Sequence, residues 1–297
     1  MRKTVVITGG NSGIGLSMAH ELARMGATVC LACRDQGKAA AARDEILQRT
    51  PGAQVELYKL DLSSFAAIHA FVQAFAQRHD RLDALINNAG AVPIRQQFTQ
   101  DGFELQFGGN YLGPFLLTHL LLPLLQVAAD EGGPGQGDAR IVHLSSIAHN
   151  LGRIELDTAK GRKPYRVLPA YAQSKLGNLM FSHTLARKLP AGITSQAMHP
   201  GGVASPIYRE LPRWQYALMR PFLIGPERPG KLAAELAIGA QRRGENGGYF
   251  SIQHPRIVSS TAKDLALQEA LYKQSCVWAD VEPLPEQVRT RQAVKPA

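Results

Sequence analysis

Apolar and polar residues follow two different periods along the chain. Short continuous apolar runs, such as residues 4–8 and 82–87, are bounded by glycine or polar turns, as is typical of strands in a parallel sheet. The longer segments between them repeat apolar residues every three or four positions, as helices do. The pattern predicts an α/β protein with a doubly wound, mostly parallel seven-stranded sheet and helices on both faces. The expected strands are residues 4–8, 27–33, 55–60, 82–87, 140–145, 193–198 and 249–252.

Helices are expected between these strands and after the last one. The stretch 116–125 is almost wholly apolar and predicts a helix buried in the core. Residues 130–138 are rich in glycine and residues 151–168 are polar and basic, so both predict surface loops. The remaining expected helices are residues 15–25, 36–48, 171–189, 231–240 and one after residue 263.

Two segments lack a clear period. Residues 203–225 carry large apolar side chains, Trp214 among them, between arginines, and predict a lid over an apolar pocket. Helix packing, a dimer contact and contact with a membrane surface are the alternatives for this segment. The proline- and charge-rich residues 283–297 predict a loose tail.

Length and composition suit one large domain, residues 1–297. The chain has 297 residues, of which 45% are hydrophobic, enough for a full-sized core. Nothing at the start resembles a signal peptide, and the apolar run 115–125 contains His119 and Pro123 and is too short to cross a bilayer. Three cysteines make no disulfide framework, so we expect a cytoplasmic protein.

The net charge of +9 suggests a polyanionic partner. Lysines and arginines are scattered and do not alternate with aromatic residues, so we expect no nucleic-acid binding, and a cofactor with several phosphates is the simpler explanation. We predict no metal site. Cys30 and Cys33 match the CxxC spacing, but residues three apart on a strand point to opposite faces, which predicts core packing for both.

The first expected strand runs into a glycine-rich turn and then into a helix. Glycine allows a backbone to approach a pyrophosphate closely, and a helix N-terminus offers free N–H groups and a positive dipole end. Although the spacing differs from the usual GxGxxG, the strand before it and the helix after it favour a phosphate cradle in a Rossmann fold over a simple turn. The predicted cradle residues are Gly9, Asn11, Ser12, Gly13, Ile14 and Gly15.

The end of the second strand predicts the choice between the two nicotinamide dinucleotides. An acidic residue at this position binds the ribose hydroxyls of NAD, whereas an arginine accommodates the 2′-phosphate of NADP. Arg34 occupies the position, with Lys38 nearby and Asp35 one residue too late. We therefore favour NADP(H), with a solvated surface arginine as the alternative.

Other strand ends carry further cofactor candidates. Asp61, before Leu62, is placed either to accept from an adenine amino group or to cap the helix near residues 63–64. The small residues of Asn88-Ala89-Gly90 would let a cofactor lie against the backbone, and an asparagine side chain would tie neighbouring strands together. A rigid turn after the sixth strand, with Pro200, Gly201 and Val203, would support a nicotinamide ring.

Tyr171 and Lys175 are the central candidates for chemistry. Side chains four residues apart share one face of a helix, and an ammonium beside a phenol favours the phenolate and lowers the tyrosine pKa. Such a phenol suits proton exchange with an alcohol or carbonyl oxygen. Ser146 ends the fifth strand, where its hydroxyl would meet a substrate oxygen, and no GxSxG elbow supports a Ser–His hydrolase. Asn110 is either a satisfied core amide or a site residue.

Together these motifs resemble the short-chain dehydrogenase/reductase family over nearly the whole chain. Residues 8–15 are similar to its cofactor turn, 87–90 to its NNAG motif and 171–175 to its YxxxK motif. The resemblance implies that Tyr171 is the acid/base, that Lys175 binds the nicotinamide ribose and that Ser146 positions the substrate oxygen. It implies further that Asn110 holds a water of the proton relay and that Asp61 and Asn88 contact the adenosine half.

Within that family the chain is most similar to the retinol dehydrogenase-like branch. The likeness rests on residues 32–35 (ACRD), 145–149 (SSIAH) and 199–201 (HPG), and on the long gap between Ser146 and Tyr171. The branch prefers NADP and acts on lipophilic alcohols and aldehydes. The branch has membrane members with an N-terminal anchor, and from the sequence we expect no such anchor here.

We therefore expect an NADP(H)-dependent oxidoreductase that acts on a small lipophilic alcohol, aldehyde or ketone. A catalytically silent NADP(H)-binding scaffold or sensor is the alternative, and a homo-oligomer is compatible with either. The expected catalytic residues are Asn110, Ser146, Tyr171 and Lys175, and the expected substrate pocket is Ser146, Tyr171 and Trp214. The expected cofactor contacts are Gly9, Asn11, Ser12, Gly13, Ile14, Gly15, Arg34, Lys38, Asp61, Leu62, Asn88, Ala89, Gly90, Tyr171, Lys175, Pro200, Gly201 and Val203.

Overall fold

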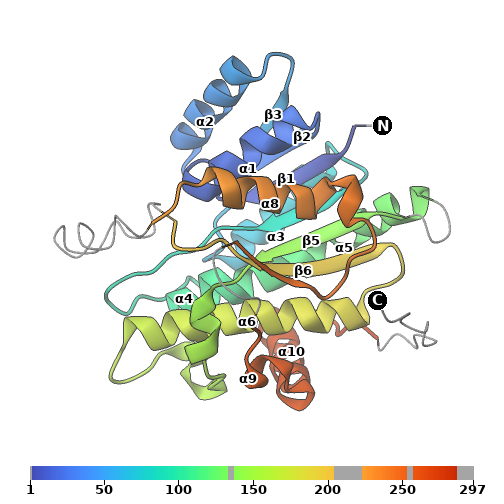
Figure 1. The fold of residues 1–297 in the computed structure, drawn as a ribbon. Helices are drawn as coiled ribbons and strands as arrows, with labels where there is room; N and C mark the ends of the chain where they lie inside the picture. Colours follow the sequence, from blue (N-terminus) through green and yellow to red (C-terminus); the bar gives the residue numbers. More distant parts are fainter. Residues whose placement is uncertain (1, 133–136, 204–222, 253–256, 286–297) are drawn as a thin grey trace.

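A computed structural model describes residues 2–132, 137–203, 223–252 and 257–285 (Figure 1). Seven strands form one sheet in the order β3-β2-β1-β4-β5-β6-β7, and every pairing of these strands is parallel. The order reverses between β1 and β4, which is the topological switch point where such sheets bind ligands. The strands are β1 Thr4–Thr8, β2 Thr28–Cys33, β3 Gln54–Lys59, β4 Ala84–Asn87, β5 Ala139–Leu144, β6 Ile193–His199 and β7 Tyr249–Ser251.

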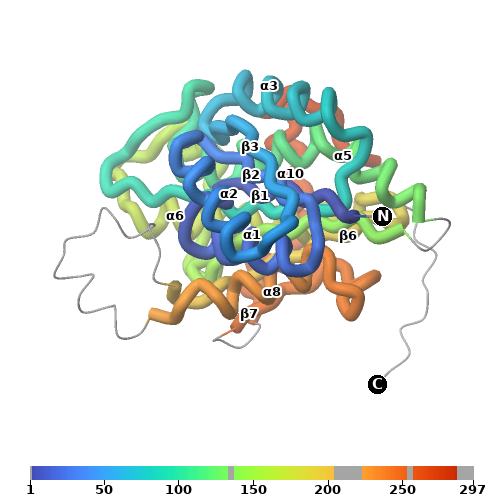
Figure 2. Tube along the Cα trace, turned by 90° about the horizontal axis from the view of Figure 1, so that it is seen from above, coloured from blue at the N-terminus to red at the C-terminus, as the bar shows by residue number. Residues whose placement is uncertain are grey.

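Helices cover both faces of this sheet. In Figure 1, α1 and α8 lie on one side of the strands and α6 on the other, and the turned view of Figure 2 shows α3 and α5 on the side opposite α8. The predicted doubly wound fold is therefore confirmed. The helices are α1 Gly13–Arg24, α2 Gln36–Arg49, α3 Phe65–Ala76, α4 Leu105–Phe107, α5 Gly113–Glu131, α6 Val167–Lys188, α8 Glu227–Ile238, α9 Ser260–Lys263 and α10 Leu265–Ala279.

Alternation along the strands divides the core in two. Val6 and Cys30 pack with α3, α5, α6 and α10, whereas Val5, Ile7 and Cys33 pack with α1, α2 and α8. Successive strand residues point to opposite faces, so each buried strand needs apolar residues at every position. Cys30 and Cys33 lie on opposite faces, as predicted, and burial raises the pKa of the Cys33 thiol to about 11.

The expected core helix is longer than its apolar run. A π-helical turn, Gly108–Leu112, leads into α5, and α5 then continues past residue 125 to Glu131. The helical stretch Leu105–Glu131 is long and apolar enough to cross a membrane, but 61% of its most apolar window is buried inside the protein. The sheet and α6 cover it, which is the ordinary state of a core helix.

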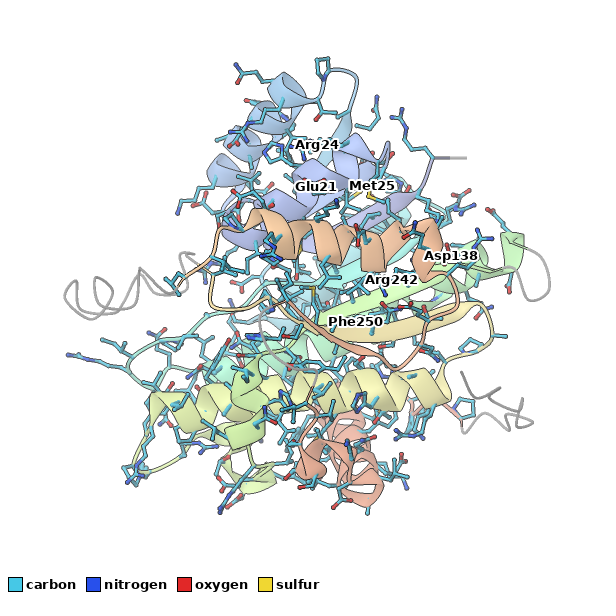
Figure 3. All side chains as sticks on the ribbon, in the orientation of Figure 1. Glu21, Arg24, Met25, Asp138, Arg242 and Phe250 are labelled. Carbon is cyan, nitrogen blue, oxygen red and sulfur yellow. The ribbon has the colours of Figure 1, made fainter. Side chains whose placement is uncertain are left out.

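The edge of the sheet at β7 is fastened by charged residues. Arg242 lies over the ring of Phe250, with 5.3 Å between the guanidinium carbon and the ring centre (Figure 3). Buried Arg140 donates to Asp138 (2.9 Å) and to the carbonyl of Gly239 (2.8 Å) at the end of α8. Arg140 thus ties the start of β5 to the end of α8, and Arg242 packs the turn after α8 against β7.

Parts of three predicted segments lie outside the described residues, among them residues 133–136 of the predicted loop 130–138. Of the expected lid, the described parts are Val203 and residues 223–225, and Val203 forms a parallel bridge with Ile224. Trp214 lies outside, as does the expected tail beyond residue 285. At the start of that tail, Leu284 N–H donates to the Tyr272 hydroxyl at 3.0 Å.

Candidate active site

The glycine turn has the close backbone packing that a phosphate cradle needs. Gly9 has φ 66°, a left-handed conformation that favours glycine. A Cβ added to Gly15 would lie 2.3 Å from the Gly9 carbonyl oxygen, so the first turn of α1 sits directly on the glycine turn. Ser12 precedes α1 without a side-chain cap, which leaves the N–H groups of the Gly13-Ile14-Gly15 turn to an anion.

Asn88 fastens this turn to the next strand. Its Nδ2 donates to the carbonyls of Thr8 (2.8 Å) and Gly9 (3.2 Å), and its backbone N–H and that of Ala89 donate to the Thr8 hydroxyl. The expectation that an asparagine here ties strands together is confirmed. Through these hydrogen bonds, Thr8 and Asn88 hold the glycine turn against the end of β4, at the topological switch point.

Of the charged residues after β2, Asp35 and Lys38 contact each other. Asp35 caps α2 by accepting from the Lys38 N–H at 3.0 Å, and its other oxygen lies 3.4 Å from the Lys38 ammonium. The hydrogen bond from the Lys38 N–H lowers the pKa of Asp35. Arg34 and Lys38 are both exposed at this edge. Asp35, the acidic residue next to Arg34 in the sequence, thus uses its carboxylate to cap its own helix.

After β3, Asp61 accepts from the N–H and hydroxyl of Ser63 at 2.9 and 2.6 Å. The residue that caps α3 is Ser64, through the Ala67 N–H, so the helix-cap interpretation of Asp61 is wrong. The short turn holds the Asp61 carboxylate half-buried at the carboxyl edge of the sheet. Leu62 is buried, and its carbonyl oxygen would lie 2.3 Å from a Cβ on Gly113.

Tyr171 and Lys175 lie together on α6. The Lys175 ammonium is 5.7 Å from the centre of the Tyr171 ring and donates to the Leu144 carbonyl at 2.9 Å. Lys175 is 4% exposed, and burial lowers its pKa to about 8. Tyr171 is half-buried and lies near buried Tyr249, whose pKa is raised first by burial and then by the Tyr171 phenol.

The two serines after β5 have different partners. The Ser145 hydroxyl donates to the Lys175 carbonyl at 2.8 Å and so joins the sheet to α6. The Ser146 hydroxyl accepts from Ala148 N–H at 3.2 Å and begins a short 3₁₀ helix, Ile147–Leu151. His149 Nδ1 donates to the Ser146 carbonyl at 2.7 Å, not to its hydroxyl, so the pair is not a Ser–His nucleophile. His149 thus positions the serine backbone, which the sequence alone did not indicate.

Asn110 combines both roles left open by the sequence. Its side-chain amide is satisfied by Ala91, accepting from the N–H at 2.7 Å and donating to the carbonyl at 2.9 Å. A Cβ on Gly90 would lie 3.5 Å from Asn110 Oδ1 and 3.7 Å from the Lys175 ammonium, so Asn110 also lies at the site. Its backbone carbonyl accepts from Asn178 Nδ2 at 3.0 Å, a residue that the sequence analysis missed although it lies one turn beyond Lys175.

The turn after β6 lies at the same carboxyl edge of the sheet. Pro200 follows β6 directly, and Gly201 has φ 87°. Val203 is buried, and Ile224 N–H donates to the Gly202 carbonyl at 2.8 Å, so the chain returns to this turn at residue 224. The sheet thus brings the glycine cradle, Asn110, Ser146, Tyr171 and Lys175 to one carboxyl edge.

One cluster of metal-ligating side chains lies away from this edge, among the described residues. Cys30, Glu56 and His79 offer ligand atoms within 4.8 Å of one another. Glu56 Oε2, however, already accepts from the Tyr58 hydroxyl (2.8 Å) and pairs with Arg78 (3.1 Å). The Arg78 guanidinium neutralises this carboxylate, and it would repel a divalent metal ion bound here.

Comparison with known proteins agrees with this geometry. A family model described as short chain dehydrogenase matches residues 3–216. Retinol dehydrogenase 11 of Homo sapiens is 40% identical over 277 residues, and retinol dehydrogenase 12 of Mus musculus is 42% identical over 277 residues. Each match covers 92% of this chain and 85% of the relative.

Solved structures share the fold. A Mycobacterium paratuberculosis protein of uncharacterised function is 34% identical with a TM-score of 0.74, and the match covers 95% of each chain. RhlG of Pseudomonas aeruginosa, in an NADP active-site complex, is 27% identical with a TM-score of 0.67, covering 84% of this chain and 94% of RhlG. The chain belongs to the short-chain dehydrogenase/reductase family, in its retinol dehydrogenase-like branch.

Proposed function

We propose that the protein transfers a hydride between NADP(H) and the carbonyl or alcohol carbon of a lipophilic substrate, with Tyr171 as general acid/base. The observation that carries this proposal is the buried Lys175 ammonium beside the Tyr171 ring, at the edge that also holds the glycine cradle. Because the site lies at the switch point, a dinucleotide on the cradle would extend toward Tyr171.

The chain's own residues would supply binding and proton transfer. The nicotinamide supplies or accepts the hydride when it is bound. In the direction of reduction, Tyr171 gives its phenolic proton to the carbonyl oxygen, and in oxidation it takes the proton back. Ser146 donates a hydrogen bond to that oxygen, and Lys175 stabilises the phenolate by its positive charge.

The preference for NADP(H) is supported by the charges after β2. Arg34 and Lys38 provide cations for a 2′-phosphate, and Asp35 is occupied as the cap of α2. One structural relative was solved with NADP, and the 3-ketoacyl-(acyl-carrier-protein) reductase of Brucella melitensis, 25% identical, was solved with NADH. The proposal therefore rests on this chain's own residues and not on its relatives.

A lipophilic substrate is supported by exposed apolar side chains close to the catalytic residues. Ile147 and Leu151 are 44% and 69% exposed on the 3₁₀ helix that follows Ser146, and Leu168 is 54% exposed in the turn before Tyr171. Such residues present apolar surface to an entering ligand. Two curated relatives are named for retinol, a lipophilic alcohol, which makes retinoids and similar alcohols and aldehydes the first substrates to test.

Substitution Tyr171→Phe tests the proposal. It should lower the turnover of NADPH with hydrophobic aldehydes by about 10²- to 10⁴-fold, because proton transfer loses its donor. Tyr58→Phe is the control, since Tyr58 bonds Glu56 on the far edge strand β3 and should keep wild-type activity. Turnover by Tyr171→Phe equal to that of the wild type would rule out the assigned role.

The silent scaffold makes a different prediction in the same assay. It would bind NADPH tightly, as measured by the fluorescence of the bound nucleotide, and oxidise it with no member of a broad panel of aldehydes and ketones. Turnover with any member that disappears in Tyr171→Phe would reject the scaffold.

A further inference from the structure

A second carboxamide lies beneath the catalytic residues. Asn178 is 4% exposed on α6, one turn beyond Lys175. Its Nδ2 donates to two backbone carbonyls, that of Asn110 at 3.0 Å and that of Leu144 at 3.3 Å. Both partners are pure acceptors, so the atom that faces them must be the nitrogen.

The Asn110 carbonyl has no α-helical donor from its own helix. In an α-helix it would accept from the residue four positions later, but that residue is Pro114, which has no N–H. The backbone forms a π-helical turn at Gly108–Leu112. The Asn178 side chain supplies a donor to this carbonyl and so fixes the turn that carries Asn110.

The Leu144 carbonyl is shared with the catalytic lysine. It accepts from Lys175 Nζ at 2.9 Å as well as from Asn178. The Asn178 amide therefore contacts both the Leu144 carbonyl, which accepts from the Lys175 ammonium, and the backbone carbonyl of Asn110. We propose that Asn178 is a positioning residue, which holds Lys175 beside Tyr171 by fixing the Leu144 carbonyl that anchors the ammonium and the turn that carries Asn110; this inference rests on the proposed role of Tyr171.

The hydrogen bonding of the Asn178 side-chain oxygen indicates that Asn178 does more than stabilise the fold. Oδ1 is buried and has no hydrogen-bond partner among the described residues. An unsatisfied buried acceptor destabilises the folded state, and an apolar side chain would avoid this loss. The Asn178 amide nitrogen donates to two carbonyls, whereas its oxygen accepts from no described residue. This is expected of a side chain that serves to hold the Asn110 and Leu144 carbonyls.

The test is an NMR titration of protein labelled with ζ-¹³C-tyrosine. Asn178→Leu keeps the branched shape of the side chain, although its methyl groups are bulkier, and removes both donors; Asn178→Ala is a second variant should leucine not fit. Each should raise the titration midpoint of Tyr171 by about half a pH unit or more, because the ammonium is no longer held at its present distance. The Tyr171→Phe spectrum assigns the signal.

Ser182→Ala is the matched control. Ser182 is equally buried on α6, and its hydroxyl bonds to Ser195, away from Lys175. Its loss should lower the melting temperature without moving the Tyr171 midpoint. A midpoint unchanged in both Asn178 variants would overturn the inference. Since this readout needs no turnover, an inactive wild type would count against the proposed function and leave the Asn178 result interpretable.

Discussion

At the residue scale, the choice of cofactor depends on what neighbouring charges already bind. Asp35 directly follows Arg34, and by residue type either one is suited to meet a ribose. The Asp35 carboxylate accepts from the Lys38 N–H at 3.0 Å and closes the first turn of α2. A carboxylate in that position stabilises its own helix, and under the proposed preference for NADP(H) the Arg34 cation beside it would meet the 2′-phosphate.

Reversing that charge should separate the two nicotinamide dinucleotides. Arg34→Glu is expected to weaken NADPH binding by about 10- to 100-fold, because a charge-assisted hydrogen bond becomes a repulsion, and to leave NADH binding nearly unchanged. Dissociation constants from nucleotide fluorescence measure both. Arg43→Glu, the same charge change elsewhere on α2, is the control. Equal losses for NADPH and NADH would refute the assignment of Arg34.

Asn110 and Asn178 show where residue-level prediction ends. Sequence context left Asn110 either as a core amide or as a site residue, and the structure shows a side chain that is satisfied by Ala91 and yet lies near Gly90, beside Lys175. Asn178 was not recognised, because a single asparagine on a buried helix has no distinctive spacing. Its partners come from β5 and the π-helical turn, which are distant in sequence.

At the element scale, strand positions were predicted to within one or two residues, and the start of α2 was predicted correctly, whereas two other helix starts were missed. Helix α6 begins at Val167 and not near Tyr171, and α8 begins at Glu227 and not at Lys231. Each contains a proline in its first turn, Pro169 or Pro229. Proline is tolerated there because the first N–H groups of a helix have no intrahelical acceptor.

The close contact between α1 and the glycine turn gives a prediction for that element. Ala at a helical glycine normally gains up to about 1 kcal/mol. At Gly15 the new Cβ would lie 2.3 Å from the Gly9 carbonyl and 2.6 Å from Asn88 Nδ2. Gly15→Ala should therefore lower the melting temperature and raise the NADPH dissociation constant at least about tenfold, since overpacking costs about 1–3 kcal/mol.

Gly37→Ala serves as the stability control for that experiment. It lies in the first turn of α2, and the nearest atom to its new Cβ is 3.5 Å away. Its melting temperature should match or exceed that of the wild type. An NADPH affinity that is unchanged in Gly15→Ala would show that the turn is not the phosphate cradle.

At the scale of the whole molecule, burial of ionisable side chains makes stability depend on pH. Burial lowers the pKa of His143 to about 3 and that of His119 to about 4. His119 packs among the rings of Phe115, Phe181 and Tyr272. Both histidines stay neutral in the folded protein, whereas an unfolded chain protonates them near pH 6.5.

Acid should therefore destabilise the fold below pH 6.5. The unfolded state binds more protons there, so the free energy of unfolding falls as pH falls toward the folded pKa values. Between pH 6.5 and 5, a histidine with a folded pKa of about 4 accounts for about 2 kcal/mol of that fall. His119→Phe should remove this part, as measured by urea unfolding at pH 7.5 and 5.0.

His69 is exposed, and His69→Gln is the control for urea unfolding at the two pH values. It should lose as much stability between the two pH values as the wild type. If His119→Phe loses as much as well, the burial of His119 does not govern the acid limit.

The sequence by itself determined the strands, the parallel α/β order, the glycine turn and the Tyr171–Lys175 pair. These features depend on period, on turn residues and on spacing within one helix, which are local properties of the chain. Only the tertiary structure decided that Asp61 does not cap α3, that His149 holds the Ser146 backbone and that Asn178 joins Asn110 to Leu144. These are contacts of buried polar groups, and which partner satisfies each group depends on which distant backbone atoms the sheet brings beside it.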